Sequence, residues 1–259
     1  MLNWQSIAVA AVLAAGAQTA SAQAFSGGMP AGWSCTGSCG TLVADGVVSL
    51  APSGGSQYGY VSSTNGSFGV SPFGFGGETN GSVLTSTSFA AASGDAVAFK
   101  FNYITSDGAG YADYAWARIT RAGDNSQVAL LFTARTTPGG STIPGFGMPA
   151  PEATVNPTDV PIIAGGPAWA PLGGSSGACW STGCGYTGWV SSSYTLNETG
   201  NFKLEFGVVN WGDTAFDSGM AFDGITIAGV PLVPEPETYA LMLGGLGVVA
   251  FVARRRKAA

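Results

Sequence analysis

Apolar and polar side chains alternate with a period of two through the middle of this chain. In the segment DAVAFKFNYIT, residues 95–105, every second side chain from Val97 to Tyr103 is apolar or aromatic. The segment NFKLEFGVVN, residues 201–210, repeats the alternation from Phe202 onwards. Successive side chains of a β-strand point to opposite faces of the sheet, so both segments predict strands with one buried and one solvated face.

Seven further short segments have the apolar character of strands, and clusters of Gly, Pro, Asn and Asp separate many of them. No long segment shows the periodicity of an amphipathic helix. About nine short strands without helices predict an all-β protein, a two-sheet antiparallel β-sandwich of the jelly-roll type. The seven segments are residues 46–52, 57–63, 82–90, 114–120, 127–134, 188–196 and 221–229.

A long segment rich in Pro and Gly, residues 136–176, interrupts this pattern. Its eight Pro residues exclude it from the central strands of a sheet. It also carries Phe146, Met148 and Trp169, which favours packing across the sandwich over a free linker. Two interpretations remain open, a lid over a binding site and a cover over a sheet edge, and we favour the cover.

The composition narrows the class of protein. Only 9% of the 259 residues are charged, 41 are Gly and none is His, which fits one large folded domain. Without His, this chain has no Ser-His-Asp or Cys-His pair and no His-ligated metal. Residues 25–233 hold five basic and thirteen acidic side chains, a net formal charge of −8. That charge argues against nucleic acid as a partner and favours a cation.

The first 24 residues have the features of a secretory signal peptide. A short apolar run, residues 7–17, precedes two small-x-small cleavage patterns, Ala20-Ser21-Ala22 and Ala22-Gln23-Ala24. The n-region lacks Lys and Arg, so a buried first helix is the alternative. The signal peptide predicts export through the Sec machinery.

The chain ends in VPEPETYALMLGGLGVVAFVARRRKAA, residues 233–259. Residues 239–253 are uncharged and would form a helix of about 22 Å, short of the roughly 30 Å of a bilayer core. Tyr239 and the terminal Arg side chains would extend its reach at the interfaces, so we predict a short transmembrane helix. The positive cluster should stay cytoplasmic and leave the body outside.

Three features of this tail follow one another in a fixed order: Pro234-Glu235-Pro236, an apolar run containing Gly244-Gly245, and a cluster of Arg residues. In this order the tail resembles the PEP-CTERM sorting signal of Gram-negative bacteria. The resemblance implies that an exosortase-type enzyme cuts the tail at the inner membrane and passes the protein to the cell surface or extracellular matrix. The predicted parts are a signal peptide (1–24), a β-sandwich domain (25–230) and a sorting signal with a transmembrane helix (231–259).

The four cysteines form two close pairs in sequence, Cys35 with Cys39 and Cys179 with Cys184. An exported protein with an even number of cysteines is expected to form disulfides. Four cysteines allow three connectivities, and the small residues between partners favour two local loops over a cross-link. A zinc site of four thiolates is the alternative, which the spacing and the oxidising compartment disfavour.

Acidic side chains gather in two Gly-containing segments, SDGAGYADY (residues 106–114) and WGDTAFDSGMAFDG (residues 211–224). Calcium binds six to eight oxygens from carboxylates and backbone carbonyls, often in such loops, although neither segment has EF-hand spacing. For any single Asp the simpler interpretation is a turn cap that accepts a nearby backbone N–H. The candidate ligands of a structural calcium ion are Asp107, Asp113, Asp213, Asp217 and Asp223.

The longer segments ITSDGAGYADYAWARI and VVNWGDTAFDSGMAFDGITI are similar to exported bacterial jelly-roll domains of the choice-of-anchor type. Those domains occur with various surface anchors, PEP-CTERM among them, and generally lack an assigned activity. The resemblance therefore implies a fold and a destination more than a function.

Our main hypothesis is a non-catalytic exported protein of the cell surface or matrix, tethered through its tail until it is processed. If its ligand is an exopolysaccharide, exposed aromatic rings would stack on the sugars. Because most aromatic side chains of a sandwich are buried, we expect one or two of the candidates to be free. They are Trp33, Tyr58, Tyr60, Trp116, Trp169, Trp180, Trp189 and Trp211.

The alternative is a carboxylate-dependent glycoside-active enzyme. Glu152 in the Pro-rich segment and Glu205 on a predicted strand are its candidate acids, although nothing in the sequence brings them together. Ice binding would require a flat face of regularly spaced Thr, and the chain has no such repeat.

Overall fold

The computed structural model describes residues 25–232 together with Leu246 and Arg254. The predicted signal peptide, Pro234-Glu235-Pro236 and the predicted transmembrane helix lie outside this part, apart from the two single residues. Within the described residues, no helix has the length and the apolar character that crossing a bilayer requires.

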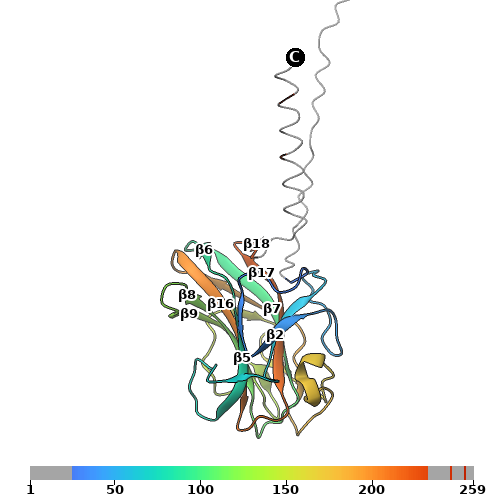
Figure 1. Cartoon of the computed structure of the whole chain (residues 1–259). Helices are drawn as coiled ribbons and strands as arrows, with labels where there is room; N and C mark the ends of the chain where they lie inside the picture. The colour runs from blue at the N-terminus through green and yellow to red at the C-terminus, as the bar shows by residue number, and fades with distance from the viewer. Residues whose placement is uncertain (1–24, 233–245, 247–253, 255–259) are drawn as a thin grey trace, which may run out of the picture.

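Two large antiparallel sheets pack face to face, which confirms the predicted sandwich (Figure 1). The first sheet has seven strands: β1 (Ser34–Thr36), β4 (Ser67–Phe68), β5 (Glu78–Thr85), β6 (Phe89–Ala91), β8 (Tyr114–Arg121), β9 (Gln127–Arg135) and β16 (Gly200–Trp211). Along its main path the order is β1-β5-β16-β8-β9, with β4 paired to β5 and β6 paired to β16.

The second sheet has nine strands, in the main order β11-β15-β7-β17-β3-β2. A short pair, β10 (Ser141–Ile143) with β12 (Val160–Pro161), and a 3-10 helix, η1 (Ala170–Ser175), lie outside both sheets. The nine strands are β2 (Ser38–Leu42), β3 (Tyr58–Ser62), β7 (Ala96–Thr105), β11 (Thr154–Asn156), β13 (Ile163–Ala164), β14 (Gly185–Tyr186), β15 (Val190–Thr195), β17 (Ser218–Ile227) and β18 (Val230–Pro231).

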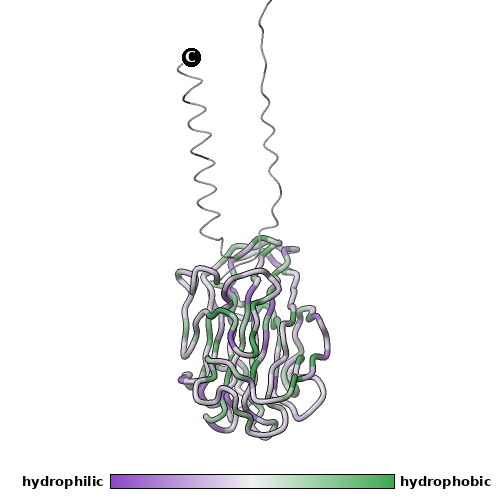
Figure 2. The backbone as a smooth tube through the Cα atoms, turned by 90° about the vertical axis from the view of Figure 1, so that its right-hand side faces the viewer, coloured by the Kyte–Doolittle hydropathy of each residue, from purple (hydrophilic) through white to green (hydrophobic). Residues whose placement is uncertain are grey.

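Aromatic rings from both sheets form the centre of the core. Phe101 of β7 stacks on Phe132 of β9 with ring centroids 3.7 Å apart, and Phe206 of β16 stacks on Phe222 of β17 at 4.1 Å. Phe99 meets Phe206 edge to face at 5.2 Å. The alternation read from the sequence therefore identifies the core face of both strands. In Figure 2 hydrophobic and hydrophilic stretches alternate over short distances along the backbone.

Two of the predicted strands differ from the structure. Residues 46–52 form only one bridge, Asp45 to Val48, because Val47 bonds to the Ala168 carbonyl in the Pro-rich segment instead of to a sheet. Residues 82–90 divide into β5 and β6. At the division the Ser86 hydroxyl accepts the N–H of Leu204 at 2.9 Å, so a side chain takes the place of a backbone partner.

The Pro-rich segment covers the second sheet. Its strand β11 pairs with β15 at the sheet edge, and the buried indole of Trp169 donates to the Tyr58 hydroxyl at 2.9 Å. Met148 packs against a small cluster on the first sheet, whereas Phe146 is 72% exposed. The cover interpretation therefore describes most of the segment, but Phe146 does not pack inside the sandwich as we expected.

The body has two ends that differ in their loops. The described part of the body ends at Leu232, whose N–H bonds to the Ile225 carbonyl beside β18. At the other end, which we call the distal end, lie the loops 106–113, 136–140, 178–184 and 212–217. In Figure 1 β6 and β18 are at the top, and the distal end faces downwards.

Candidate functional site

The loops of the distal end are fastened to one another by backbone hydrogen bonds. Loop 178–184 donates from the Trp180 N–H to the Ser106 carbonyl at 3.0 Å and accepts the Ala109 N–H at the Thr182 carbonyl at 2.9 Å. A disulfide between Cys179 and Cys184 closes the same loop. Two backbone hydrogen bonds and one disulfide therefore hold this loop in place.

Trp180 lies in this closed loop and is 53% exposed. Its ring centroid is 5.2 Å from that of Phe216 and 6.3 Å from that of Tyr111, two half-buried neighbours from loops 212–217 and 106–113. We call Trp180, Tyr111 and Phe216 the aromatic patch. Trp180 is thus an exposed ring on a loop that is fastened to the body.

The other aromatic candidates are less accessible than Trp180. Three are fully buried and the remaining four are half-buried, each with at least one ring or core contact in the body. Sequence reasoning therefore included the exposed ring but not its two neighbours, Tyr111 and Phe216. The buried three are Tyr58, Trp116 and Trp169; the half-buried four are Trp33, Tyr60, Trp189 and Trp211.

A cavity of about 460 Å³ opens beside the aromatic patch. Ala109 and Ala112, which flank Tyr111 in the sequence, form part of its wall. The lining also includes one charged and two aromatic residues, Arg135, Phe146 and Trp211. Thr136, Thr137 and Pro138 complete the lining.

Beneath the loops, Asp113 is completely buried. Its carboxyl accepts the Ser218 hydroxyl at 2.6 Å and the Trp211 N–H at 2.8 Å. Burial raises the pKa of Asp113 well above its usual range, and the neighbouring charges of Asp107 and Asp213 raise it further. Asp113 thus fastens β17 to β16 and loop 106–113.

Asp107 is also buried, but its carboxyl is only partly bonded. One oxygen accepts the Gly108 N–H at 2.6 Å, and Oδ2 has no partner. Burial, with a further contribution from Asp213, raises the pKa of Asp107 to about 7. A second buried oxygen without a partner belongs to Asn210, whose amide nitrogen lies 3.4 Å from Asp217 Oδ1.

The structure brings four of the five predicted calcium ligands to the distal end. Asp213 accepts the Ala215 N–H at 2.8 Å, as expected for a carboxylate that caps a turn, whereas Asp217 accepts the Ser63 hydroxyl from a distant part of the chain at 2.9 Å. Asp223 lies apart, in register with Lys100, and accepts the Ser53 hydroxyl. Among the described residues, no three acidic or cysteine side chains are arranged to hold a metal ion.

Calcium therefore stays a prediction, for which the unpartnered oxygens of Asp107 and Asn210 are the structural argument. Calcium accepts amide, carbonyl and water oxygens besides carboxylates. We expect a hundredfold excess of calcium over its Kd to add about 2.7 kcal/mol of stability and raise Tm by about 5 °C or more. A thermal melt in calcium, magnesium and chelator checks this, and equal Tm values in calcium and chelator would refute it.

The stability of the body should fall as pH rises from about 4 to 7. Folding raises the pKa of Asp107 from 3.8 to about 7 and that of Asp223 to about 6, both mainly through burial. The folded state then holds protons that the unfolded chain has released, so stability is greatest below the unfolded pKa and decreases up to the folded one. Denaturation at about pH 5 and pH 8 measures the slope, which Asp107→Asn should reduce; an unchanged slope in that variant contradicts the assignment.

The cysteines form two local pairs in the structure. Cys35 with Cys39 joins β1 of the first sheet to β2 of the second, across Gly37. Gly37 has φ +89°, and a Cβ there would collide with the Ser82 hydroxyl, so the crossing requires glycine. Cys184 is held in the separate distal loop with Cys179, so the four sulfurs are not arranged as one zinc site.

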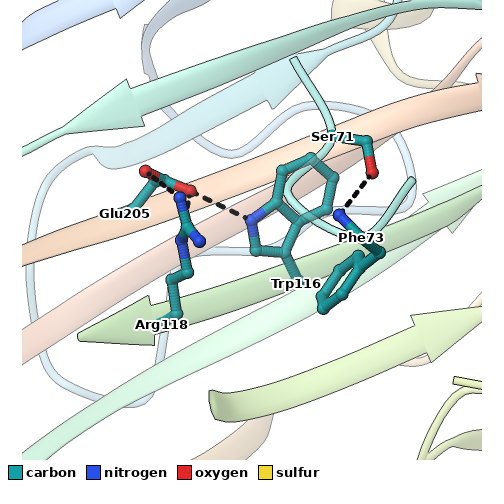
Figure 3. A network of polar contacts seen from close by, with 5 residues as sticks. All are labelled: Ser71, Phe73, Trp116, Arg118 and Glu205. Carbon is teal, nitrogen blue, oxygen red and sulfur yellow. Dashed lines mark hydrogen bonds and ion pairs between the residues drawn. The ribbon is translucent and has the colours of Figure 1, made fainter. Parts of the chain in front are cut away.

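The two carboxylates of the enzyme hypothesis both have structural partners. Glu205 forms a bidentate ion pair with Arg118, at 2.7 and 3.0 Å, and accepts the Trp116 indole N–H at 3.3 Å (Figure 3). Phe73 packs edge to face on Trp116 at 5.7 Å. Glu152 accepts the Leu130 N–H at 2.6 Å. Neither carboxylate lines the cavity beside the aromatic patch.

Comparison with protein families concerns the tail. Residues 232–257 match the model of the PEP-CTERM protein-sorting motif. The chain carries a PEP-CTERM sorting signal. The motif implies an exported protein that transits a membrane and is processed by an exosortase-type enzyme, and the two disulfides fit an extracytoplasmic location.

Comparison with solved structures gives distant β-sandwich neighbours, and no curated protein matches the sequence. The cleaved adhesin domain of Lys-gingipain from Porphyromonas gingivalis aligns at TM-score 0.37 with 11% identity, over 78% of this chain and 94% of that domain. The carbohydrate-binding module TmCBM61, solved with β-1,4-galactotriose, aligns at TM-score 0.33 with 10% identity, over 76% of this chain and 88% of the module.

Proposed function

We propose that this exported protein is a non-catalytic, polysaccharide-binding component of the surface or extracellular matrix of a Gram-negative bacterium. After Sec export, its PEP-CTERM tail tethers it to the inner membrane until an exosortase-type enzyme removes the tail. The aromatic patch at the distal end is the proposed sugar-binding surface.

The exposed indole of Trp180 is the observation that carries this proposal. A Trp ring offers an apolar face for the C–H groups of a sugar ring, and polar atoms around it bond to the hydroxyls. Loop 178–184 holds the ring ready through its disulfide and two backbone hydrogen bonds. Little conformational entropy is then lost on binding.

The position of the patch fits a tethered protein. The described part of the body ends at Leu232, beside β18, whereas Ser218, at the opposite end of β17, borders the distal loops. A protein held by its C-terminal tail would therefore present Trp180 away from its attachment. The structural partners of Glu152 and Glu205 support binding over catalysis, since neither carboxylate faces the cavity.

A glycan array tests the proposal, with the full-length exported protein purified in detergent and probed with and without calcium. The proposal expects binding to a limited set of related polysaccharides. If no glycan binds under either condition, the protein has a purely structural role and the proposal fails.

A further inference from the structure

We propose that the cavity beside the aromatic patch binds a carboxylated sugar residue, a uronate, and that Arg135 is the ligand of its carboxylate. This inference rests on the proposed binding of polysaccharide and specifies the sugar class. It concerns side chains outside the aromatic patch and outside the predicted calcium ligands.

Arg135 is the arginine of residues 25–232 that forms no ion pair. Arg118 and Arg121 form ion pairs with Glu205 and Glu198. Lys100 and Lys203 donate to Ser191 and Asn125. Within the same residues, Arg135 has no carboxylate partner either; it donates to two carbonyls and lies over two aromatic rings.

Those carbonyls use only part of the guanidinium. Arg135 Nε donates to the Ala112 carbonyl at 3.0 Å, and Nη1 donates to the Phe146 carbonyl at 3.4 Å. A guanidinium has five N–H donors in a planar fork that matches a carboxylate, so donors remain for a ligand. Ala112 and Phe146, which supply these two carbonyls, both line the cavity, so the bonds hold the group beside it.

Aromatic rings fix the plane of this group. The Arg135 guanidinium carbon is 5.3 Å from the ring centroid of Trp211 and 5.7 Å from that of Tyr114. Trp211 is itself held by a 2.7 Å bond from its indole N–H to the Gly76 carbonyl. The cation is thus oriented before a ligand arrives, as a specific anion site requires.

The cavity matches a sugar in size and lining. Its volume of about 460 Å³ lies within the roughly 300–1,000 Å³ of small-molecule sites. Phe146, which is 72% exposed, offers a ring face for a pyranose, and Trp211 lines the same cavity. Ala112 lines the cavity and is next to Tyr111 in the sequence, so one polysaccharide chain would contact the cavity and Trp180 together.

The nearby acid Asp113 does not oppose an anion strongly. Its carboxyl accepts the Ser218 hydroxyl and the Trp211 N–H, and Asp113 is not among the residues that line the cavity. Elsewhere the body is strongly acidic, so Arg135 provides a local positive site on a negative surface. A uronate is then recognised by contact with this site and not by long-range attraction.

The test is calorimetric titration of the full-length protein with two acidic oligosaccharides, oligogalacturonate and oligomannuronate. The methyl ester of each is titrated separately for comparison. Esterification keeps the sugar and the linkage but removes the charge. We expect at least one acid to bind ten times more tightly than its ester, and Arg135→Gln to abolish that difference. Arg135→Lys should retain part of it, because it keeps the charge but loses the fork.

Phe146→Ala keeps the test interpretable if Arg135→Gln fails to fold, because this exposed ring has no ring partner. It should weaken binding of the acid without lowering Tm. Equal binding of acid and ester, or no binding of either pair, overturns the uronate inference. If neither acid binds in this titration but neutral glycans bind on the array, the proposed function stands and only the uronate inference fails. If no glycan binds on the array, the proposed function and the uronate inference both fail.

Discussion

Trp180→Ala is expected to weaken polysaccharide binding by about thirtyfold or more. Truncation of a central aromatic anchor typically costs about 2 kcal/mol or more, and 1.4 kcal/mol is tenfold in Kd. The indole is 53% exposed and supplies the accessible ring face of the aromatic patch. Titration calorimetry against the best glycan of the array measures the change.

Two further variants separate binding from folding in this experiment. Trp180→Phe keeps a ring and should recover part of the affinity. Val230→Ala alters a side chain that is 63% exposed on β18, at the opposite end, and should bind as the wild type does. Full affinity in Trp180→Ala at an unchanged Tm would remove the aromatic patch from the proposal.

Phe206→Ala is expected to lower the free energy of unfolding by about 3–5 kcal/mol. The ring is fully buried, stacks on Phe222 at 4.1 Å and meets Phe99 edge to face, so its loss opens a cavity between the sheets. Denaturant unfolding with the disulfides intact measures the difference.

Phe68→Ala is the matched control for this change. Its ring is 74% exposed on β4, and exposed substitutions typically change stability by less than about 0.5 kcal/mol. If the two Phe variants lost similar stability, Phe206 would not be the centre of the inter-sheet packing.

The sandwich was predictable because its central strands carry strong local signals. In β7 and β16 the apolar side chains recur at every second residue, and this period specifies both the strand and its buried face. The local disulfides and the sorting tail were visible for a similar reason, since close spacing or an ordered motif defines them.

Other elements depend on contacts that a single segment does not reveal. Residues 46–52 are apolar enough for a strand, but Val48 packs with Trp169, more than a hundred residues away in the sequence. The crossing between β1 and β2 at Gly37 becomes necessary only when Ser82 lies beside it. Ser86 interrupts a strand through its bond to Leu204.

The candidate site was only partly predictable. Trp180 was one of eight aromatic candidates, because exposure depends on the finished fold. Tyr111 and Phe216 were missed, although both lie in the acidic loops that the sequence singled out, so aromatic residues next to clustered Asp were the available signal. Arg135 was missed because its lack of a carboxylate partner is a tertiary property.

Hydrogen–deuterium exchange of the full-length protein, with and without its array-selected glycan, tests the central claim most directly. The account predicts slower exchange confined to the distal loops 106–113, 136–140, 178–184 and 212–217, with no change in β6 or β18 at the other end. Protection elsewhere on the sandwich, with the distal loops unaffected by bound glycan, would contradict it.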